Sequence, residues 1–258
     1  MSSVLSGRRI LLTRPEGQVE SLATRLRAQG AEISHFPAIR ITLAPPDSTA
    51  QVLVEQATFI IFVSANAVRG LMAGPDPLVH VVRRASGIAA IGPATTKALL
   101  QIGLEPDVVA PPPYNSEALL SAPVLQDLKR RQVVIVRGQS GREMLADELG
   151  RRGAEVQYLE VYRRDPPTDM LSIGEMPGGP PEAICITSAE IAENLLQCVT
   201  SEEETVLRES ALIAGNTRIA EACRKLGYTA PAGVADNPGD DAMIDALTSC
   251  FAALPPNA

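Results

Sequence analysis

The sequence has few of the side chains that usually carry redox, metal or aromatic-stacking chemistry. Its 258 residues contain no tryptophan and only 3% aromatic residues, which disfavours a surface that stacks nucleic-acid bases. The two histidines, His35 and His80, have no neighbouring histidine or cysteine to suggest a metal site, and we expect them at a strand edge or on the surface. The four cysteines show no metal spacing, so we expect reduced thiols in a cytoplasmic protein. Cys185, within "AICIT", is expected in a core.

Charge and hydropathy exclude two further classes. The net charge is −7, so overall charge gives no reason to expect nucleic-acid binding. No run of 18 or more apolar residues is present, so no membrane span is expected. The apolar run after Arg9 is too short for a signal peptide and predicts a first strand. The remaining class is a soluble protein of one large or two modest domains.

Common catalytic motifs are also absent. The sequence has no GxSxG, no phosphate-binding P-loop and no GxGxxG. The glycine-containing "RGQSGRE" at 137–143 lacks the Lys-Ser/Thr ending of magnesium–nucleotide sites. The chemistry must therefore come from other residue types.

An internal repeat organises the chain. The segment that begins "RRILLTRPEG" at Arg8 resembles the segment that begins "RRQVVIVRGQ" at Arg130, and Gly30 aligns with Gly153 at a shift of 123. "FIIFVSANAV" resembles "EAICITSAEI" at a shift of 124. "AIGPATTKAL" resembles "IAGNTRIAEA", with Gly92 on Gly215 and Thr95 opposite Arg218 at a shift of 123. The repeat indicates an ancient duplication.

Each half alternates short apolar strands with amphipathic helices, which predicts parallel sheets. We expect an α/β protein with two flavodoxin-like, doubly wound parallel-sheet domains joined by a two-stranded linker. Gly30 and Gly153 are expected just beyond helix ends, and "EISHFPAIRI" (32–41) is expected to form one strand. Proline-rich stretches predict connections between the domains, at 43–48, 163–168 and 176–182.

Ligands of open parallel sheets bind beyond the carboxyl ends of the strands. The residues expected there are rich in hydroxyls, small side chains and arginines, and poor in carboxylates. They include Arg14, Ser64, Gly92 and Thr95 from the first half, and Arg137, Ser140, Arg142, Ser188, Thr217 and Arg218 from the second. This set suits an anionic ligand held by helix N-termini and guanidinium groups, in a cleft between two opposed faces.

Simpler roles remain open for the same residues. Arg14 and Arg137 could form ordinary salt bridges, and Ser64 and Ser188 could be plain helix N-caps. Gly92 could be required only for turn geometry.

With these residues in hand, the chain resembles the uroporphyrinogen-III synthase family over nearly its whole length. The segment "VRGQSGREMLADELGRRGAEVQYLEVYRR" is the most specific of the matching stretches. The others follow in the family's order: "LLTRPEGQ", "FVSANAV", "AAIGPATTKAL", "ITSAEIAENL" and "AGNTRIAEACRKLG". The resemblance implies a first domain of residues 1–37 and 169–258, a second domain of residues 46–159, and linker strands at 38–45 and 160–168.

The resemblance also implies the reaction. Linear hydroxymethylbilane is cyclised to uroporphyrinogen III with inversion of the last pyrrole ring and loss of water, without a metal or organic cofactor. Tyr162 matches the family's linker tyrosine and is the candidate general acid, and Thr95 matches the threonine of the Gly-x-x-Thr turn. Arg218 stands where many relatives have threonine, and Val63 replaces a frequent threonine.

We expect a cytoplasmic protein with no nucleic-acid or membrane partner, and a monomer, because a hinge between the domains needs freedom and no long exposed apolar helix face is evident. Transient contacts with neighbouring pathway enzymes stay open. Two alternatives stay open at this point. One is a catalytically inactive two-domain module that binds an anionic small molecule, and the other is an inactive relative with a regulatory role.

Overall fold

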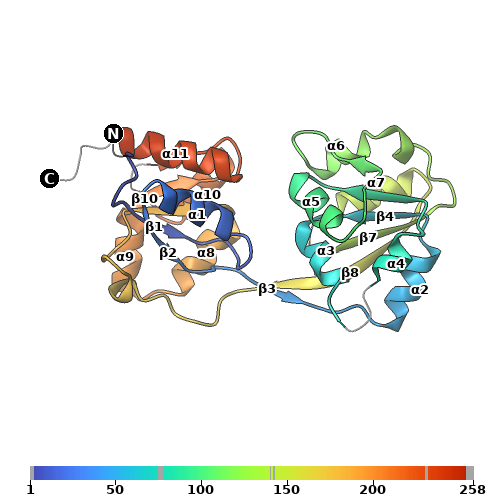
Figure 1. Cartoon of the computed structure of the whole chain (residues 1–258), viewed down its shortest axis with the longest axis horizontal. Coiled ribbons are helices and arrows are strands. Elements are labelled where there is room, and N and C mark those ends of the chain that lie inside the picture. The colour runs from blue at the N-terminus through green and yellow to red at the C-terminus, as the bar shows by residue number, and fades with distance from the viewer. Residues whose placement is uncertain (1–2, 75–77, 140, 142, 230–231, 254–258) are drawn as a thin grey trace. The chain divides into compact units, whose positions relative to one another are not determined.

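The computed structural model describes residues 3–74, 78–139, 141, 143–229 and 232–253. The chain divides into two units, one made of Met1–Arg40 with Asp165–Ala258 and the other of Ile41–Arg164. It therefore crosses between the units twice, once after Arg40 and once after Arg164. Each unit is described by itself below (Figure 1).

The first unit is a parallel sheet with the strand order β11-β10-β9-β1-β2. Its elements are β1 (Arg9–Leu12), α1 (Glu20–Ala28), β2 (Glu32–His35), η2 (Ile173–Glu175), β9 (Ala183–Ile186), α8 (Ala189–Gln197), α9 (Ser201–Glu209), β10 (Ala211–Ala214), α10 (Thr217–Lys225), β11 (Ala232–Val234) and α11 (Asp240–Ala253). Helices α1 and α11 lie side by side and bury apolar side chains against β1, β9 and β10 (Figure 1). Strands buried in this way read as continuous apolar runs, which explains the "RILL", "AICI" and "ALIA" segments.

The second unit is a sheet with the order β3-β8-β7-β4-β5-β6. The strands from β8 to β6 are parallel. Its elements are β3 (Arg40–Leu43), α2 (Ser48–Gln56), β4 (Phe59–Phe62), α3 (Ala65–Leu71), α4 (Val79–Val82), β5 (Gly87–Ala90), α5 (Pro93–Gln101), β6 (Val108–Val109), α6 (Ser116–Leu120), η1 (Pro123–Leu125), β7 (Gln132–Gly138), α7 (Met144–Arg151) and β8 (Glu155–Asp165).

Alternation along β4 shows how the second unit is layered. Ile60 and Phe62 point into a core formed with α2, α3, α4 and α5. Phe59 and Ile61 point into the opposite core, formed with α6, η1 and α7. Because successive side chains of a strand point to opposite faces, one apolar run supplies both cores.

The two sheets confirm the predicted α/β class and the repeat. In the first unit the order corresponds to the flavodoxin-like 2-1-3-4-5 when its strands are counted along the chain. In the second unit β8, β7, β4, β5 and β6 take the places of β2, β1, β9, β10 and β11. The β1–α1–β2 segment thus completes the sheet of the second repeat, while β7–α7–β8 completes the sheet of the first.

Two expectations about connections are corrected. The predicted strand over 32–41 is two strands in different sheets, β2 and β3, because Pro37 lies between them and has no N–H to donate to a ladder. The proline-rich stretches 43–48 and 176–182 lie inside the second and first units respectively. Asp47 of the former caps α2, accepting hydrogen bonds from the backbone N–H groups of Thr49 and Ala50.

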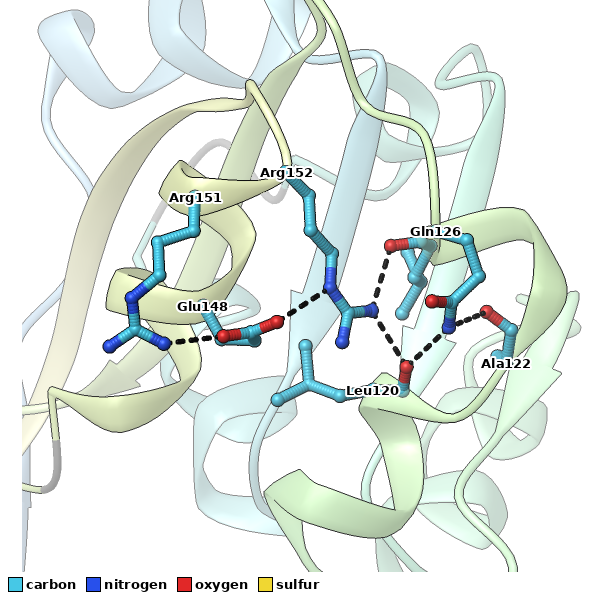
Figure 2. A network of polar contacts seen from close by, with 7 residues as sticks. Leu120, Ala122, Gln126, Glu148, Arg151 and Arg152 are labelled. Atoms are coloured by element: carbon cyan, nitrogen blue, oxygen red, sulfur yellow. Dashed lines mark hydrogen bonds and ion pairs between the residues drawn. The ribbon is translucent and has the colours of Figure 1, made fainter.

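A polar network fixes the segment after α6. Arg152 donates from Nη1 to the backbone carbonyls of Leu120 and Leu125, and from Nε to Glu148. The Gln126 amide donates to the same Leu120 carbonyl. Figure 2 shows Arg151 on the other side of Glu148, extending away from those carbonyls. The C-terminal end of α6 is therefore attached to α7 through one largely buried guanidinium.

Candidate functional site

The carboxyl edge of the second sheet collects the residues that follow β4, β5 and β7. Phe62 pairs in register with Ala90 on one side and with Val136 on the other. The point at which the chain changes winding direction lies between β7 and β4, where ligands of doubly wound sheets bind. Ser64 and Gly138 lie at this point, and Tyr162 lies on the next strand, β8.

The structure brings Tyr162 and Ser64 together. The Tyr162 hydroxyl lies 3.1 Å from the Ser64 Oγ, close enough for a hydrogen bond in which either group donates. Ser64 also caps α3, since its Oγ accepts a hydrogen bond from the Ala67 N–H. Tyr162 is 4% exposed, and its ring belongs to the core shared with α3. Tyr162 therefore holds its hydroxyl at the first turn of α3.

A register shift in β8 aims Tyr162 at that turn. Arg137 pairs with Glu160, whereas the next residue of β7, Gly138, pairs with Tyr162. Val161 is the extra residue, and it faces the same core as Tyr162 although the two are adjacent in sequence. Without the bulge, strict alternation would place Tyr162 on the opposite face of the sheet from Val161. Bulges near active sites re-aim side chains in this way.

Gly138 leaves space for the tyrosine ring. Strand β7 lies between β4 and β8, so the Tyr162 side chain crosses the end of β7 to reach Ser64. A Cβ on Gly138 would lie 2.6 Å from Cε2 and 2.7 Å from Cζ of Tyr162. Those separations are shorter than real contacts, so any larger residue would displace the ring.

In the turn after β5, the threonine hydroxyls form hydrogen bonds with backbone carbonyls of the same turn. Gly92 caps α5 with a φ of 85°, a conformation that favours glycine. Thr95 is 2% exposed, and its Oγ1 donates to the Ile91 carbonyl at 2.8 Å. Thr96 donates to the Gly92 carbonyl in the same way. Thr95 thus fixes the strand-to-helix turn beside Gly92.

Arg137 is enclosed rather than exposed. It is 5% exposed, and its guanidinium lies 4.4 Å from the centroid of the Tyr158 ring. Its Nη1 lies 3.3 Å from the Glu143 carboxylate, which also accepts a hydrogen bond from the Tyr158 hydroxyl. Burial, followed by that hydrogen bond, raises the pKa of Tyr158 to about 12. A Cβ on Gly141 would lie 2.5 Å from the Arg137 Nη2, so the loop backbone covers the guanidinium.

Ser140 and Arg142 were also predicted to bind the ligand, from the loop that follows β7. Both lie outside the described residues. Arg14 is the first unit's counterpart of Arg137 in the repeat. It donates to the Asp240 carboxylate at 2.5 Å, to the Pro238 carbonyl at 2.7 Å and to the Gln18 carbonyl at 3.4 Å. Arg14 therefore ties the loop after β1 to the start of α11.

Polar residues also follow β9 and β10 in the first unit. Ser188 caps α8 by accepting a hydrogen bond from the Ile191 N–H, and Asn216 caps α10 by accepting one from the Ile219 N–H. Thr217 and Arg218 are exposed on the first turn of α10. No described residue forms an ion pair with Arg218.

The predicted alignment of the two glycine turns is wrong by one residue. Helices α5 and α10 start at positions separated by 124, with N-caps Gly92 and Asn216. Thr95 consequently matches Ile219, and both are buried. Arg218 matches Ala94 instead. The physical reason is the cap, because Asn216 caps α10 through its side chain whereas Gly92 caps α5 through its backbone conformation alone.

Sequence reasoning missed three residues of this arrangement. Gly138 was visible only as part of "RGQSGRE", and its role depends on the neighbouring tyrosine ring. Glu143 forms an ion pair with Arg137, and Asp240 forms one with Arg14. No sequence motif has these spacings. The bulge in β8 also has no composition signal, since the uninterrupted strand reads "EVQYLEVYRRD".

The cysteine and histidine side chains lie where the sequence predicts them. Cys185 is buried in β9, and burial raises the pKa of its thiol to about 12. All four cysteines are free. His35 ends the edge strand β2, and His80 is exposed on α4.

Within the described ranges, no three His, Cys, Asp or Glu side chains gather as metal ligands would. None of the helices described has the length and apolar character needed to cross a membrane.

Comparison with known proteins identifies the family. The family model described as uroporphyrinogen-III synthase HemD matches residues 20–245. The chain belongs to the uroporphyrinogen-III synthase family. The uroporphyrinogen-III synthase of Salmonella typhimurium is 32% identical, over 92% of this chain and 99% of the relative. That of Escherichia coli is 28% identical, over the same shares of the two chains. These relatives support uroporphyrinogen-III synthase activity for the chain.

Solved structures of uroporphyrinogen-III synthases share the fold. A mutant enzyme from Thermus thermophilus superposes with a TM-score of 0.61 at 21% identity, covering 96% of this chain and 100% of that one. The Helicobacter pylori enzyme gives 0.62 at 17% identity, covering 94% of this chain and 99% of that one. At these identities the likeness shows the two-domain α/β fold alone.

Proposed function

We propose that this uroporphyrinogen-III synthase cyclises hydroxymethylbilane to uroporphyrinogen III, with Tyr162 as the general acid. The observation that carries this assignment is the 3.1 Å contact between the Tyr162 hydroxyl and Ser64. It lies at the switch point of the second sheet, beside the first turn of α3. A bulge and a glycine are both used to hold the tyrosine there.

The reaction requires correct positioning of the bilane and one proton donor. It does not require a strong nucleophile. The bilane loses its hydroxyl as water, because the pyrrole nitrogen stabilises the azafulvene that remains. The phenol O–H of Tyr162 can supply the proton to the departing hydroxyl. The substituted carbon of the last ring then attacks the methylene of the azafulvene and gives a spiro intermediate. The original bond between that ring carbon and its bridging methylene breaks, and the free α-carbon of the same ring bonds to that methylene, which inverts the ring. The proton lost from the α-carbon balances the proton that Tyr162 gave to the departing water. Holding the bilane in a folded shape lowers the barrier by removing orientational freedom before the bond forms.

Ser64 acts on Tyr162 rather than on the substrate. Its Oγ accepts the Ala67 N–H and lies 3.1 Å from the Tyr162 hydroxyl, so the helix cap fixes the serine that orients the phenol. By the repeat shift of 123, the counterpart of Tyr162 in the first unit is the buried Ile39. Ser188 repeats the cap of Ser64, but the first repeat has no tyrosine at the corresponding position. We therefore place the proton transfer in the second unit alone.

The eight carboxylates of the bilane need donors, and helix N-termini and arginines provide them. Arg218 is the candidate with the strongest support, because it is exposed on the first turn of α10 next to Thr217. Ser188 and Gly92 mark the first turns of α8 and α5, where backbone N–H groups lack partners within the helix. Arg14 and Arg137 are held by Asp240 and Glu143, which favours structural roles for them.

We further propose a cofactor-independent reaction in the cytoplasm by a monomer. The leaving-group chemistry of the bilane supports the first point, since the pyrrole supplies the electrons. Four free cysteines support a reducing compartment.

The test supplies hydroxymethylbilane, generated in situ, and separates the uroporphyrin isomers after oxidation. We expect isomer III from the native chain. Isomer I is the spontaneous product, and its exclusive formation would overturn the proposal. Binding of the bilane without isomer III would then indicate a catalytically inactive binding module.

A further inference from the structure

Tyr114 is unlike the other aromatic residues of this chain. It is 45% exposed, and it is the only aromatic ring among the large apolar side chains that are exposed in the described part of the chain. The four phenylalanines, Tyr162 and Tyr228 are each 9% exposed or less. In a chain with 3% aromatic residues and no tryptophan, one ring left in solvent requires an explanation.

The backbone of Tyr114 is in the left-handed region. Its φ is 57°, and the only other non-glycine described with a positive φ is Arg130. Such a conformation is unfavourable for a side chain with a Cβ, and it persists where the surroundings impose it. Here the Tyr114 N–H donates to the Pro111 carbonyl, and the next residue, Asn115, caps α6 by accepting the Ala118 N–H. The Arg152 network holds the other end of α6.

The location of Tyr114 is the carboxyl edge of the second sheet. A Cβ on Gly92 would lie 3.4 Å from the Tyr114 Cβ, so the tyrosine lies beside the turn that ends β5. Strand β5 is next to β4, which leads to Ser64. The exposed ring therefore belongs to the same edge as the Tyr162–Ser64 pair.

We propose that Tyr114 is a substrate-binding residue that packs its ring against a pyrrole of the bilane. The inference rests on the proposed function, which supplies a ligand with four flat apolar rings. Carboxylate donors alone would hold the periphery of such a ligand and leave its ring faces in water. An exposed aromatic ring on a fixed backbone gives one of those faces a partner at little entropic cost. Keeping tyrosine at a position that suits glycine or asparagine is explained by this contact.

Three variants separate binding from folding. Tyr114→Phe keeps the ring, and we expect KM and kcat within about twofold of the native values. Tyr114→Ala removes the ring, and we expect KM to rise about fivefold to tenfold. Tyr114→Gly removes both the ring and the unfavourable φ, so we expect the same rise in KM together with a higher Tm.

Arg130→Gly is the matched control. Arg130 has a φ of 58°, is exposed and belongs to the loop before β7. The Arg130→Gly substitution is expected to raise Tm without changing KM. A Tyr114→Gly variant with raised Tm and native KM would overturn the proposal, as would a Tyr114→Phe variant with the defect of Tyr114→Ala. Isomer III from the native chain, measured in the same assay, distinguishes this failure from a failure of the proposed function.

Discussion

The hydroxyl of Tyr162 and the Oγ of Ser64 are 3.1 Å apart, although 98 residues separate them in the chain. Three features of the second unit produce this contact: the parallel arrangement of β4, β7 and β8, the bulge at Val161 and the absence of a side chain at Gly138. The contact gives one tyrosine a fixed hydroxyl at the ligand-binding edge of the sheet, and it leads to the following predictions.

Ser64→Ala should lower turnover as well as stability. The loss of the N-cap costs about 1 kcal/mol of unfolding free energy. The freed Tyr162 hydroxyl should also lower kcat about tenfold, which corresponds to about 1.4 kcal/mol. Asp47→Ala removes the cap of α2 in the same unit and serves as the control. Equal kcat for the two variants, measured by isomer III formation, would show that Ser64 acts only as a cap.

Gly138→Ala should displace the Tyr162 ring. The new methyl group would lie 2.6 Å from Cε2, and the backbone of a central strand cannot move far enough to relieve the contact. A displacement of about 1 Å at a reacting group can cost about 100-fold in rate. Gly150→Ala, where a Cβ meets nothing within 4 Å, should instead stabilise α7 without changing kcat. A Gly138→Ala enzyme with native kcat would remove the steric argument.

Asp240→Asn should weaken the first unit in a pH-dependent way. Burial alone would raise the pKa of Asp240, but hydrogen bonds from Arg14 and Ser21 and the nearby arginine charges lower it below its usual value. A carboxylate with a lowered folded-state pKa stabilises the protein above its unfolded-state pKa and loses that effect as the pH falls through the folded-state value. We expect the variant to be about 1–2 kcal/mol less stable at neutral pH.

The difference between native and Asp240→Asn proteins should start to shrink near about pH 4, where the unfolded carboxylate takes up its proton. Denaturant titrations at several pH values measure it. A difference that stays constant on acidification would contradict an ion pair with Arg14.

Arg152→Ala should destabilise the second unit by about 1–3 kcal/mol, because the Leu125 carbonyl loses its donor while the Leu120 carbonyl keeps only Gln126. Arg151→Ala removes only the ion pair of a side chain that is 71% exposed, and it should cost at most about 0.5 kcal/mol. Figure 2 shows these two neighbours on opposite sides of Glu148. Urea unfolding of the two variants tests the difference, and equal midpoints would contradict it.

The sequence predicts the alternation of strands and helices because apolar runs and caps are local signals. Ser64 and Ser188 are N-caps, and Gly30 and Gly153 follow helix ends with positive φ, as expected. The repeat predicts that the two sheets have equivalent strands, since a duplicated sequence carries duplicated patterns. These features depend on residues within a few positions of one another.

The features that aim Tyr162 are not local. A bulge depends on the registers of two strands, and the need for glycine at position 138 depends on a ring that arrives from β8. The predicted alignment of Thr95 with Arg218 was wrong because Gly92 and Gly215 look equivalent in sequence. In the structure the N-caps of α5 and α10, Gly92 and Asn216, are the equivalent residues. The partners of Arg14 and Arg137 likewise come from distant or exposed carboxylates.

The most direct test of the Tyr162 assignment is the turnover of Tyr162→Phe, followed as uroporphyrinogen III formed from hydroxymethylbilane generated in situ. Phenylalanine keeps the ring that packs beside Gly138 and removes only the hydroxyl. We predict a loss of kcat of about 100-fold to 10,000-fold with little change in KM or Tm. Unchanged kcat in a folded Tyr162→Phe enzyme would show that this hydroxyl is not the acid.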